Sequence, residues 1–137
     1  MDDGALIAAA WERMKSAYAP YSRFQVGAAV LGASGAVYGG ANVENASYGA
    51  TLCAERAAIA AAVNAGERRL TAIAVCGGTD GVVTGFCPPC GICRQAMREF
   101  ADPKAFRILV ARSRTDYRAF TLDGLLPESF GPESLDA

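Results

Sequence analysis

The chain has 137 residues, of which 52% are apolar and 20% are charged, and its formal net charge is −1. This length suits one domain with its own core, and the composition is ordinary for a globular protein. A net charge near zero offers no broad basic surface for nucleic acid or an anionic membrane. Four arginines near the C-terminal end are interpreted as a solvated sheet edge: Arg107, Arg112, Arg114 and Arg118.

The chain begins with the acidic stretch MDDGALIAAAW, whereas a secretory signal carries positive charge before its apolar run. An unbroken apolar stretch such as 57–63 is too short to span a bilayer. We therefore expect a cytoplasmic protein that binds neither membrane nor nucleic acid. In that compartment, an odd count of five cysteines favours metal binding or catalysis over a disulfide framework.

Apolar spacing and turn residues predict alternating helices and strands. The predicted helices cover 4–18, 51–65 and 91–100, and the predicted strands cover 25–33, 36–43, 70–76, 107–112 and 117–122. Ser34-Gly35 marks a turn between two antiparallel strands, and Gly66 is the expected stop of the second helix. The order predicts one α/β domain over 1–137, with two or three layers around a mixed sheet.

Three cysteines form a candidate metal site. Cys90 and Cys93 have CxxC spacing at the start of one predicted helix, and Cys53 opens another. The free N–H groups and partial positive charge of a helix start stabilise thiolates. If the two helix starts face each other, three thiolates reach one zinc ion and leave its fourth position to water, as in catalytic sites. The chain has no histidine, which excludes histidine-dependent triads and histidine ligands.

Two more thiols leave alternatives open. If Cys87 were a fourth ligand, the site would be closed and structural. The two prolines between Cys87 and Cys90 stiffen the segment, which makes it hard to wrap around one ion. Cys76 lies in an apolar strand and is interpreted as a small core residue.

Two charged residues follow Cys53 closely. Glu55 is placed to reach a metal-bound water as a general acid and base, and the alternative is a solvated glutamate in a first helical turn. Arg56 lies one turn from Cys53. We hypothesise that it donates hydrogen bonds to the ligand sulfurs and offsets the negative charge of zinc with three thiolates; the alternative is a surface arginine.

The sequence Cys-Ala-Glu at 53–55, followed by Pro-Cys-Gly-x-Cys-Arg-Gln at 89–95, resembles the small cytidine deaminases of nucleoside salvage. Matching stretches extend over most of the chain: YSRFQVGAAV, GANVENASYG, TLCAER, PCGICRQ and LLPESFGP. The resemblance implies a three-layer α/β/α fold with a mixed five-stranded sheet. It also implies one zinc ion per subunit on Cys53, Cys90 and Cys93, and a homotetramer with sites near subunit interfaces. The pair Cys87-Pro88 departs from the family's pattern.

The resemblance further implies the reaction: hydrolysis of cytidine and deoxycytidine to uridine and deoxyuridine with release of ammonia, zinc activating water and Glu55 moving protons. The implied substrate contacts are Phe24 against the pyrimidine, the Ala54 backbone against the base, Asn42 and Glu44 on the ribose hydroxyls, and Tyr48 and Phe130 toward a neighbouring subunit's site. These side chains suit a ring face and vicinal hydroxyls. The alternatives are a turn role for Asn42 and a core role for Phe24.

Three other functions stay open at this point. A deaminase of another aminopyrimidine, such as blasticidin S, is disfavoured by the ribose-type sequence NVEN at 42–45. A polynucleotide deaminase would need a basic groove. A noncatalytic zinc-stabilised interaction module would have a closed fourth position and would leave Asn42, Glu44 and Glu55 without a role.

Overall fold

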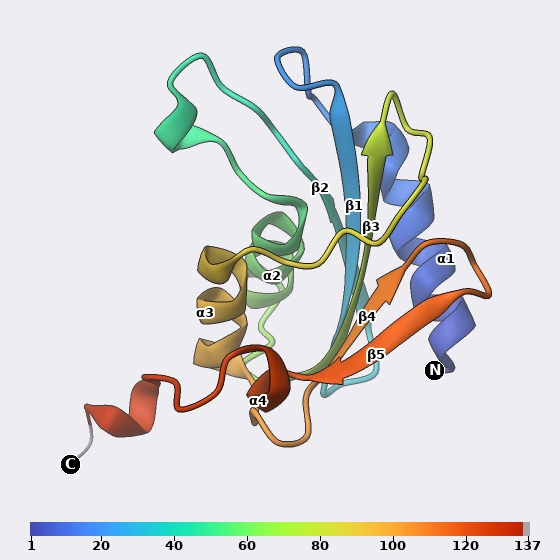
Figure 1. The fold of residues 1–137 in the computed structure, drawn as a ribbon. Coiled ribbons are helices and arrows are strands. Elements are labelled where there is room, and N and C mark those ends of the chain that lie inside the picture. The colour runs from blue at the N-terminus through green and yellow to red at the C-terminus, as the bar shows by residue number, and fades with distance from the viewer. Residues whose placement is uncertain (136–137) are drawn as a thin grey trace.

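Five strands form one mixed sheet in the computed structural model, which describes residues 1–135 (Figure 1). They are β1 (Phe24–Gly32), β2 (Val37–Ala41), β3 (Leu70–Thr79), β4 (Arg107–Ala111) and β5 (Tyr117–Thr121), in the order β2-β1-β3-β4-β5. Among the paired strands of residues 1–135, β3 and β4 alone are parallel, because the chain returns between them through a helix. The predicted mixed five-stranded sheet is confirmed.

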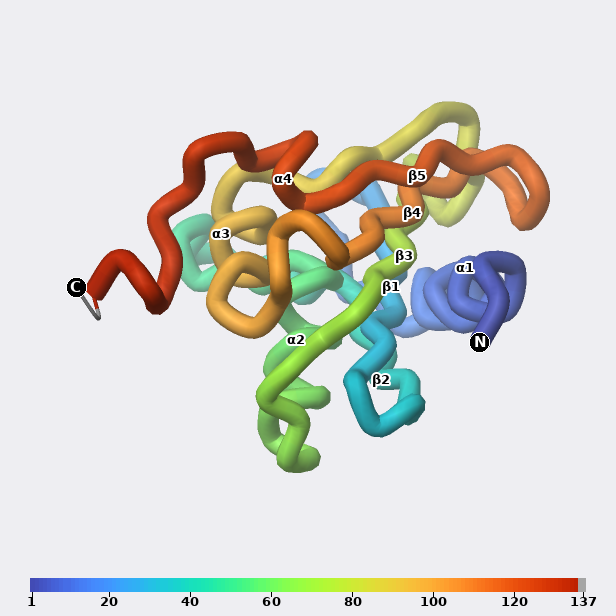
Figure 2. Tube along the Cα trace, turned by 90° about the horizontal axis from the view of Figure 1, so that it is seen from below, coloured from blue at the N-terminus to red at the C-terminus, as the bar shows by residue number. Residues whose placement is uncertain are grey.

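Helices cover both faces of this sheet. Helix α1 (Asp3–Arg13) lies on one face, and α2 (Ala54–Asn64) and α3 (Gly91–Phe100) lie side by side on the other (Figure 2). Two apolar clusters result, one between the sheet and α1 and one between the sheet and the α2–α3 pair. The central strand β3 is therefore buried along nearly its whole length. This confirms the three-layer arrangement.

Several element boundaries differ from the prediction. The first helix ends at Arg13 and is followed by one 3-10 turn, Met14–Ser16. It does not reach Tyr18, because the N–H of Tyr18 donates to the carbonyl of Asn42 at 2.9 Å instead. Strand β3 runs three residues past Cys76, where Gly78 pairs with β1. A Cβ atom on Gly78 would lie 2.0 Å from the carbonyl oxygen of Val82, so this close approach requires glycine. Gly66 ends α2 with φ +106, as predicted.

The short helix α4 (Leu122–Leu125) follows β5 directly and was not predicted. Its N-cap is Thr121, whose hydroxyl accepts from the N–H of Gly124 at 3.1 Å. The helix was missed because it is a single turn inside an apolar stretch that also suits the end of a strand.

The C-terminal arginines are not merely a solvated edge. The guanidinium of Arg107 donates two hydrogen bonds to Asp3, at 2.6 and 2.8 Å, and Tyr117 donates a third at 2.8 Å. These hydrogen bonds, from Arg107 first, lower the pKa of Asp3 to about 2. The cluster joins the start of α1 to β4 and β5. Arg112 and Arg118 also have partners, which are described below.

Across the described residues, the helices are all too short or too polar to cross a membrane.

Candidate metal centre and adjoining pocket

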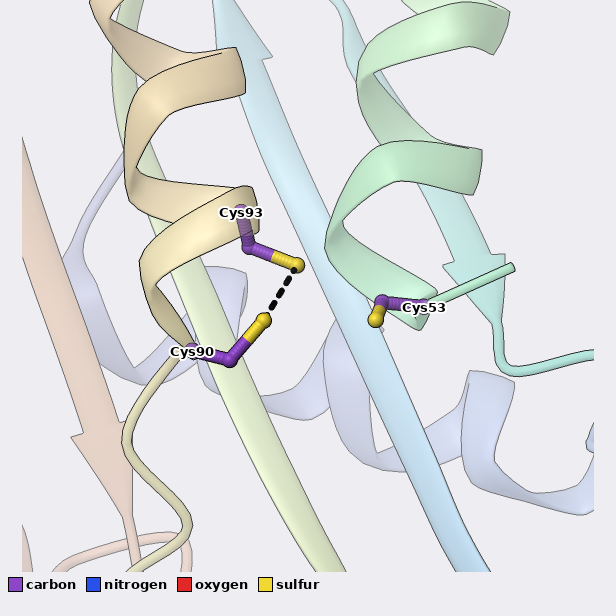
Figure 3. Close-up of side chains that lie close together, drawn as sticks. All are labelled: Cys53, Cys90 and Cys93. Carbon is purple, nitrogen blue, oxygen red and sulfur yellow. Dashed lines mark hydrogen bonds between the residues drawn. The ribbon is translucent and has the colours of Figure 1, made fainter. Parts of the chain in front are cut away.

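The first turns of α2 and α3 bring three thiols together (Figure 3). Cys53 is the N-cap residue of α2, Cys90 is the N-cap residue of α3, and Cys93 lies in the first turn of α3. Their sulfur atoms all lie within 4.8 Å of one another, and the sulfurs of Cys90 and Cys93 are 3.6 Å apart. The predicted meeting of the two helix starts is confirmed.

This geometry fits a zinc ion. Tetrahedral zinc with Zn–S bonds of about 2.3 Å places its sulfur ligands roughly 3.8 Å apart. This is close to the 3.6 Å between the sulfurs of Cys90 and Cys93, and the sulfur of Cys53 lies within 4.8 Å of both. Burial, followed by the nearby Glu55 and Cys53, raises the pKa of Cys93. Burial also acts on Cys90, but hydrogen bonds from the backbone and thiol of Cys93 outweigh it and lower the pKa of Cys90. A bound cation supplies the positive charge that deprotonates such thiols.

The other two cysteines stand outside the group. Within residues 1–135, the metal-sized cluster contains three thiols, and Cys87 is not one of them. Burial, followed by the charges of Glu55, Cys53 and Cys90, raises the pKa of Cys87 to about 11. Cys76 is fully buried on the α1 face, and burial raises its pKa to about 12. These positions weigh against a closed four-thiol site and agree with a core role for Cys76.

Glu55 faces the same centre from the first turn of α2. Its side chain is only 5% exposed, so it is not a solvated first-turn glutamate. It lines a cavity of about 190 Å³ with Cys53, Ala54, Cys87 and Cys90. Burial raises the pKa of the Glu55 carboxyl above its ordinary value, although its own backbone N–H and Cys93 oppose the effect.

Arg56 lies directly against the thiols and is not a surface arginine. Its Nη2 atom donates to the carbonyl of Thr51 at 3.2 Å and to the sulfur of Cys53 at 3.6 Å. Its Nε atom is buried and has no hydrogen-bond partner in residues 1–135. A half-buried guanidinium with a spare donor at its buried Nε, beside these sulfurs, is suited to a centre that carries net negative charge.

A second, larger pocket of about 400 Å³ adjoins the first. Thr51 lines both, and the larger pocket is otherwise bounded by Tyr21, Ser22, Glu44, Asn45 and Tyr48. The structure thus places Asn42, Cys53, Ala54 and Glu55 on the inner cavity, and Glu44 and Tyr48 on the outer pocket. The side chains of Phe24 and Phe130 line neither of them.

Asn42 and Glu44 have different surroundings. The Asn42 side chain, 8% exposed, accepts from the N–H of Val26 at 2.9 Å and donates to the carbonyl of Phe24 at 2.8 Å. It therefore fixes the start of β1 as well as lining the cavity. The Glu44 carboxylate accepts from the hydroxyl of Ser22 at 2.5 Å and from the backbone N–H groups of Tyr21 and Ser22. These bonds, the Ser22 hydroxyl first, lower the pKa of Glu44.

Comparison with known proteins decides the family. The family model described as the cytidine and deoxycytidylate deaminase zinc-binding region matches residues 1–109. The chain belongs to this family. A cytidine deaminase from Halalkalibacterium halodurans is 45% identical over 136 residues, covering 99% of each chain. A cytidine deaminase from Sporosarcina psychrophila is 41% identical over 135 residues, covering 98% of this chain and 96% of that one.

Solved structures of the family have the same fold. The crystal structure of cytidine deaminase from Burkholderia pseudomallei gives a TM-score of 0.86 at 45% identity, covering 95% of this chain and 100% of that one. A crystal structure of cytidine deaminase from Mycobacterium tuberculosis gives 0.81 at 41% identity, covering 96% and 98%. The family model's zinc-binding region includes Cys53, Cys90 and Cys93 of this chain.

Two aromatic residues that the family resemblance singles out point into solvent. Tyr48 is 77% exposed and packs edge to face on Tyr21, with ring centroids 6.2 Å apart. Phe130 is 60% exposed on the C-terminal tail, where its carbonyl accepts from Gln95 at 2.9 Å. Large exposed aromatic rings of this kind are common where another protein surface docks.

Ser22 and Thr51 line the pockets but were not singled out from the sequence. The hydroxyl of Ser22 bonds to Glu44, which lies 22 residues further along the chain. A serine in the loop APYSRF carries no periodic signal that would reveal such a contact. Thr51 opens the stretch TLCAER, so its nearness to Cys53 was the available signal.

Proposed function

We propose that the chain is a zinc-dependent cytidine deaminase that hydrolyses cytidine and deoxycytidine to uridine and deoxyuridine and releases ammonia. The observation that carries this proposal is the buried carboxylate of Glu55 in a cavity that is also lined by Cys53 and Cys90, two of the three converging thiols. A noncatalytic zinc-stabilised module gives no reason to bury an acid beside the metal centre and to leave a cavity there. Membership of the deaminase family supports the same conclusion.

Cys53, Cys90 and Cys93 would hold the zinc ion. When bound, zinc would supply Lewis acidity that lowers the pKa of a water molecule. The guanidinium of Arg56 offsets part of the thiolate charge through its contact with Cys53. By drawing electron density from the sulfurs, Arg56 preserves this acidity.

Glu55 carries the proton transfers. Its carboxylate accepts a proton from the attacking water and delivers it to N3 of the ring while the water oxygen bonds to C4. The proton of the new C4 hydroxyl then passes through Glu55 to the amino group, the C4–N bond breaks, ammonia leaves, and C4 becomes a carbonyl. A group that both accepts and donates protons works best with a pKa near the working pH, and burial moves the pKa of Glu55 in that direction.

The remaining predicted residues are proposed to bind the nucleoside. The ionised Glu44 suits the ribose hydroxyls as an acceptor, because it lines the outer pocket and its three bonds from Ser22 and Tyr21 leave one of its roughly four lone-pair sites free. Asn42 keeps one N–H and one lone pair after its two backbone bonds. We assign the Ala54 backbone to the base and Phe24 to the pyrimidine face, which requires the Phe24 ring to turn toward the inner cavity.

We also propose a homotetramer in which Tyr48 and Phe130 approach a neighbouring subunit's site. An apolar groove of about 350 Å³ between α2 and α3 supports association; it is lined by Leu52, Arg56, Ile59, Ala60, Val63, Ala96 and Phe100. Light scattering after size-exclusion chromatography tests this assembly, and a monomer at micromolar concentration would contradict it. A cytoplasmic location and a role in pyrimidine salvage are proposed on the same family grounds.

The activity is tested by ultraviolet absorbance of cytidine and deoxycytidine incubated with zinc-loaded protein. We expect the cytosine band to disappear and ammonia to accumulate in equal amount. A zinc-loaded, folded protein that leaves both nucleosides intact would contradict the proposal. Blasticidin S and a cytosine-containing oligonucleotide serve as competing substrates, and faster turnover of either would move the assignment to that alternative.

A further inference from the structure

An irregular loop connects β3 to α3 and carries one of the three thiols. Residues 83–90 contain no helix or strand, yet Cys90 at the end of this loop must lie within reach of Cys53. One anchor is Arg94, which donates to the carbonyl of Pro89 and to that of Leu125, both at 2.7 Å. This anchor holds the helix side of the loop.

Phe86 provides the contact on the other side. Its ring is half-buried against the core, and the guanidinium carbon of Arg118 lies 4.1 Å from the ring centroid. The guanidinium carbon of Arg112 lies 4.9 Å from the same centroid. A cation within about 6 Å of an aromatic face is attracted by the ring's quadrupole. The loop therefore runs alongside β5, as Figure 2 shows.

The two arginines are not equivalent. Arg112 forms an ion pair with Asp116 in the turn between β4 and β5. Within the described part of the chain, Arg118 forms no ion pair or side-chain hydrogen bond, and its guanidinium lies over the Phe86 ring. Arg118 also lies on strand β5, where it pairs with Val110 of β4. Strand pairing holds its backbone more rigidly than that of a residue beside a turn.

The segment between Phe86 and the thiol is stiff. Pro88 and Pro89 fix two of the backbone φ angles between Phe86 and Cys90. A displacement of the Phe86 ring is therefore passed on to Cys90 rather than absorbed within the segment. We propose that Arg118, through Phe86, is a positioning residue that keeps Cys90 on the metal, an inference that rests on the zinc centre of the proposed function.

The rate of zinc release into excess chromogenic chelator tests this role without any substrate. The variants are Arg118→Met, which keeps an apolar stem without the charge, Arg118→Lys, which keeps the charge, and Phe86→Leu, which keeps apolar bulk without the ring. We expect Arg118→Met and Phe86→Leu to release zinc about three-fold faster, as an exposed cation–π contact implies. Arg118→Lys should be closer to the native rate. Arg114→Met, in the same hairpin, is the matched control and should match the native protein.

Urea unfolding of each variant separates positioning from general stability. A faster release at the native unfolding midpoint supports the proposal, and Phe86→Leu carries the test if Arg118→Met does not fold. The native release rate in Arg118→Met, or an equal change in Arg114→Met, would overturn it. A native protein that holds no zinc would remove this inference and the proposed function together. Zinc that is held but released at an unchanged rate removes this inference alone.

Discussion

The two ends of helix α2 each carry a nearly buried glutamate, and the pKa values of the two carboxyl groups shift in opposite directions. Glu55, at the start, is 5% exposed, and burial raises its pKa beside three thiols. Glu67, just past the end, is 8% exposed, and hydrogen bonds from Ser34 and Tyr38 lower its pKa. The comparison teaches that burial of an acid alone does not indicate function; the chemistry of its neighbours does.

The Glu67 end is structural in every contact. Its carboxylate also occupies the space where a Cβ atom on Gly32 would stand, so it fixes the turn between β1 and β2 against α2. The Glu55 end faces a cavity and a set of thiols, and the charge of Glu55 helps to raise the pKa of Cys93. Four experiments sharpen or break this contrast.

The largest expected effect comes from a pair of buried cysteines. Cys93→Ala should lower the zinc content from one ion per chain to none and abolish deamination, because it removes a proposed ligand. Cys76→Ala, equally buried on the other face, should keep zinc and activity and cost about 1 kcal/mol of stability. Zinc analysis by mass spectrometry, with turnover of cytidine, checks both. Full zinc in Cys93→Ala would break the contrast.

The glutamates themselves give the next effect. Glu55→Gln should lower kcat by ~10²–10⁴-fold while zinc stays bound, because the amide cannot accept and donate the protons. Glu67→Gln is the matched control; it should leave kcat unchanged and lower the thermal unfolding midpoint. Steady-state kinetics and calorimetry measure the two outcomes. Equal losses of kcat in the two variants would mean that both act through the fold.

A smaller effect is expected at the outer pocket. Glu44→Gln should raise KM for cytidine by roughly ten-fold and leave kcat nearly unchanged, because a hydrogen bond from a neutral hydroxyl to a charged acceptor is weakened in both ground and transition states. Initial rates across a range of cytidine concentrations give both constants. A fall in kcat with constant KM would place Glu44 in the chemistry instead.

The smallest effect concerns Asp3, the carboxylate at the start of α1 that is ion-paired with Arg107. Its folded pKa of about 2 lies below the ordinary value of 3.8, so Asp3 stabilises the fold above about pH 4. That contribution is lost as the pH falls from 4 toward 2. Since Arg107 is half exposed, Asp3→Asn should cost no more than about 1 kcal/mol at neutral pH. Urea unfolding of both proteins at pH 7 and pH 2.5 measures it; a difference that grows on acidification would contradict the sign.

The metal centre was largely predictable from sequence because its signals are local. CxxC spacing and cysteines at two helix starts predicted that Cys53, Cys90 and Cys93 lie together. Helix α3 also has its predicted bounds, Gly91–Phe100. The start of α2 was placed three residues early, because Cys53 has an extended backbone as the N-cap residue. The contacts of Ser22 with Glu44 and of Phe86 with Arg118 join distant segments, and no periodic pattern encodes them.

The central claim is that three thiols hold one zinc ion beside Glu55. The most direct measurement is a crystal structure of the zinc-loaded protein with anomalous diffraction recorded on both sides of the zinc absorption edge. The account predicts one anomalous peak per chain, bonded to the sulfurs of Cys53, Cys90 and Cys93, with Glu55 within hydrogen-bond reach of a water on the fourth position. A peak with Cys87 as the fourth ligand, or a Glu55 turned away from the metal, would contradict it.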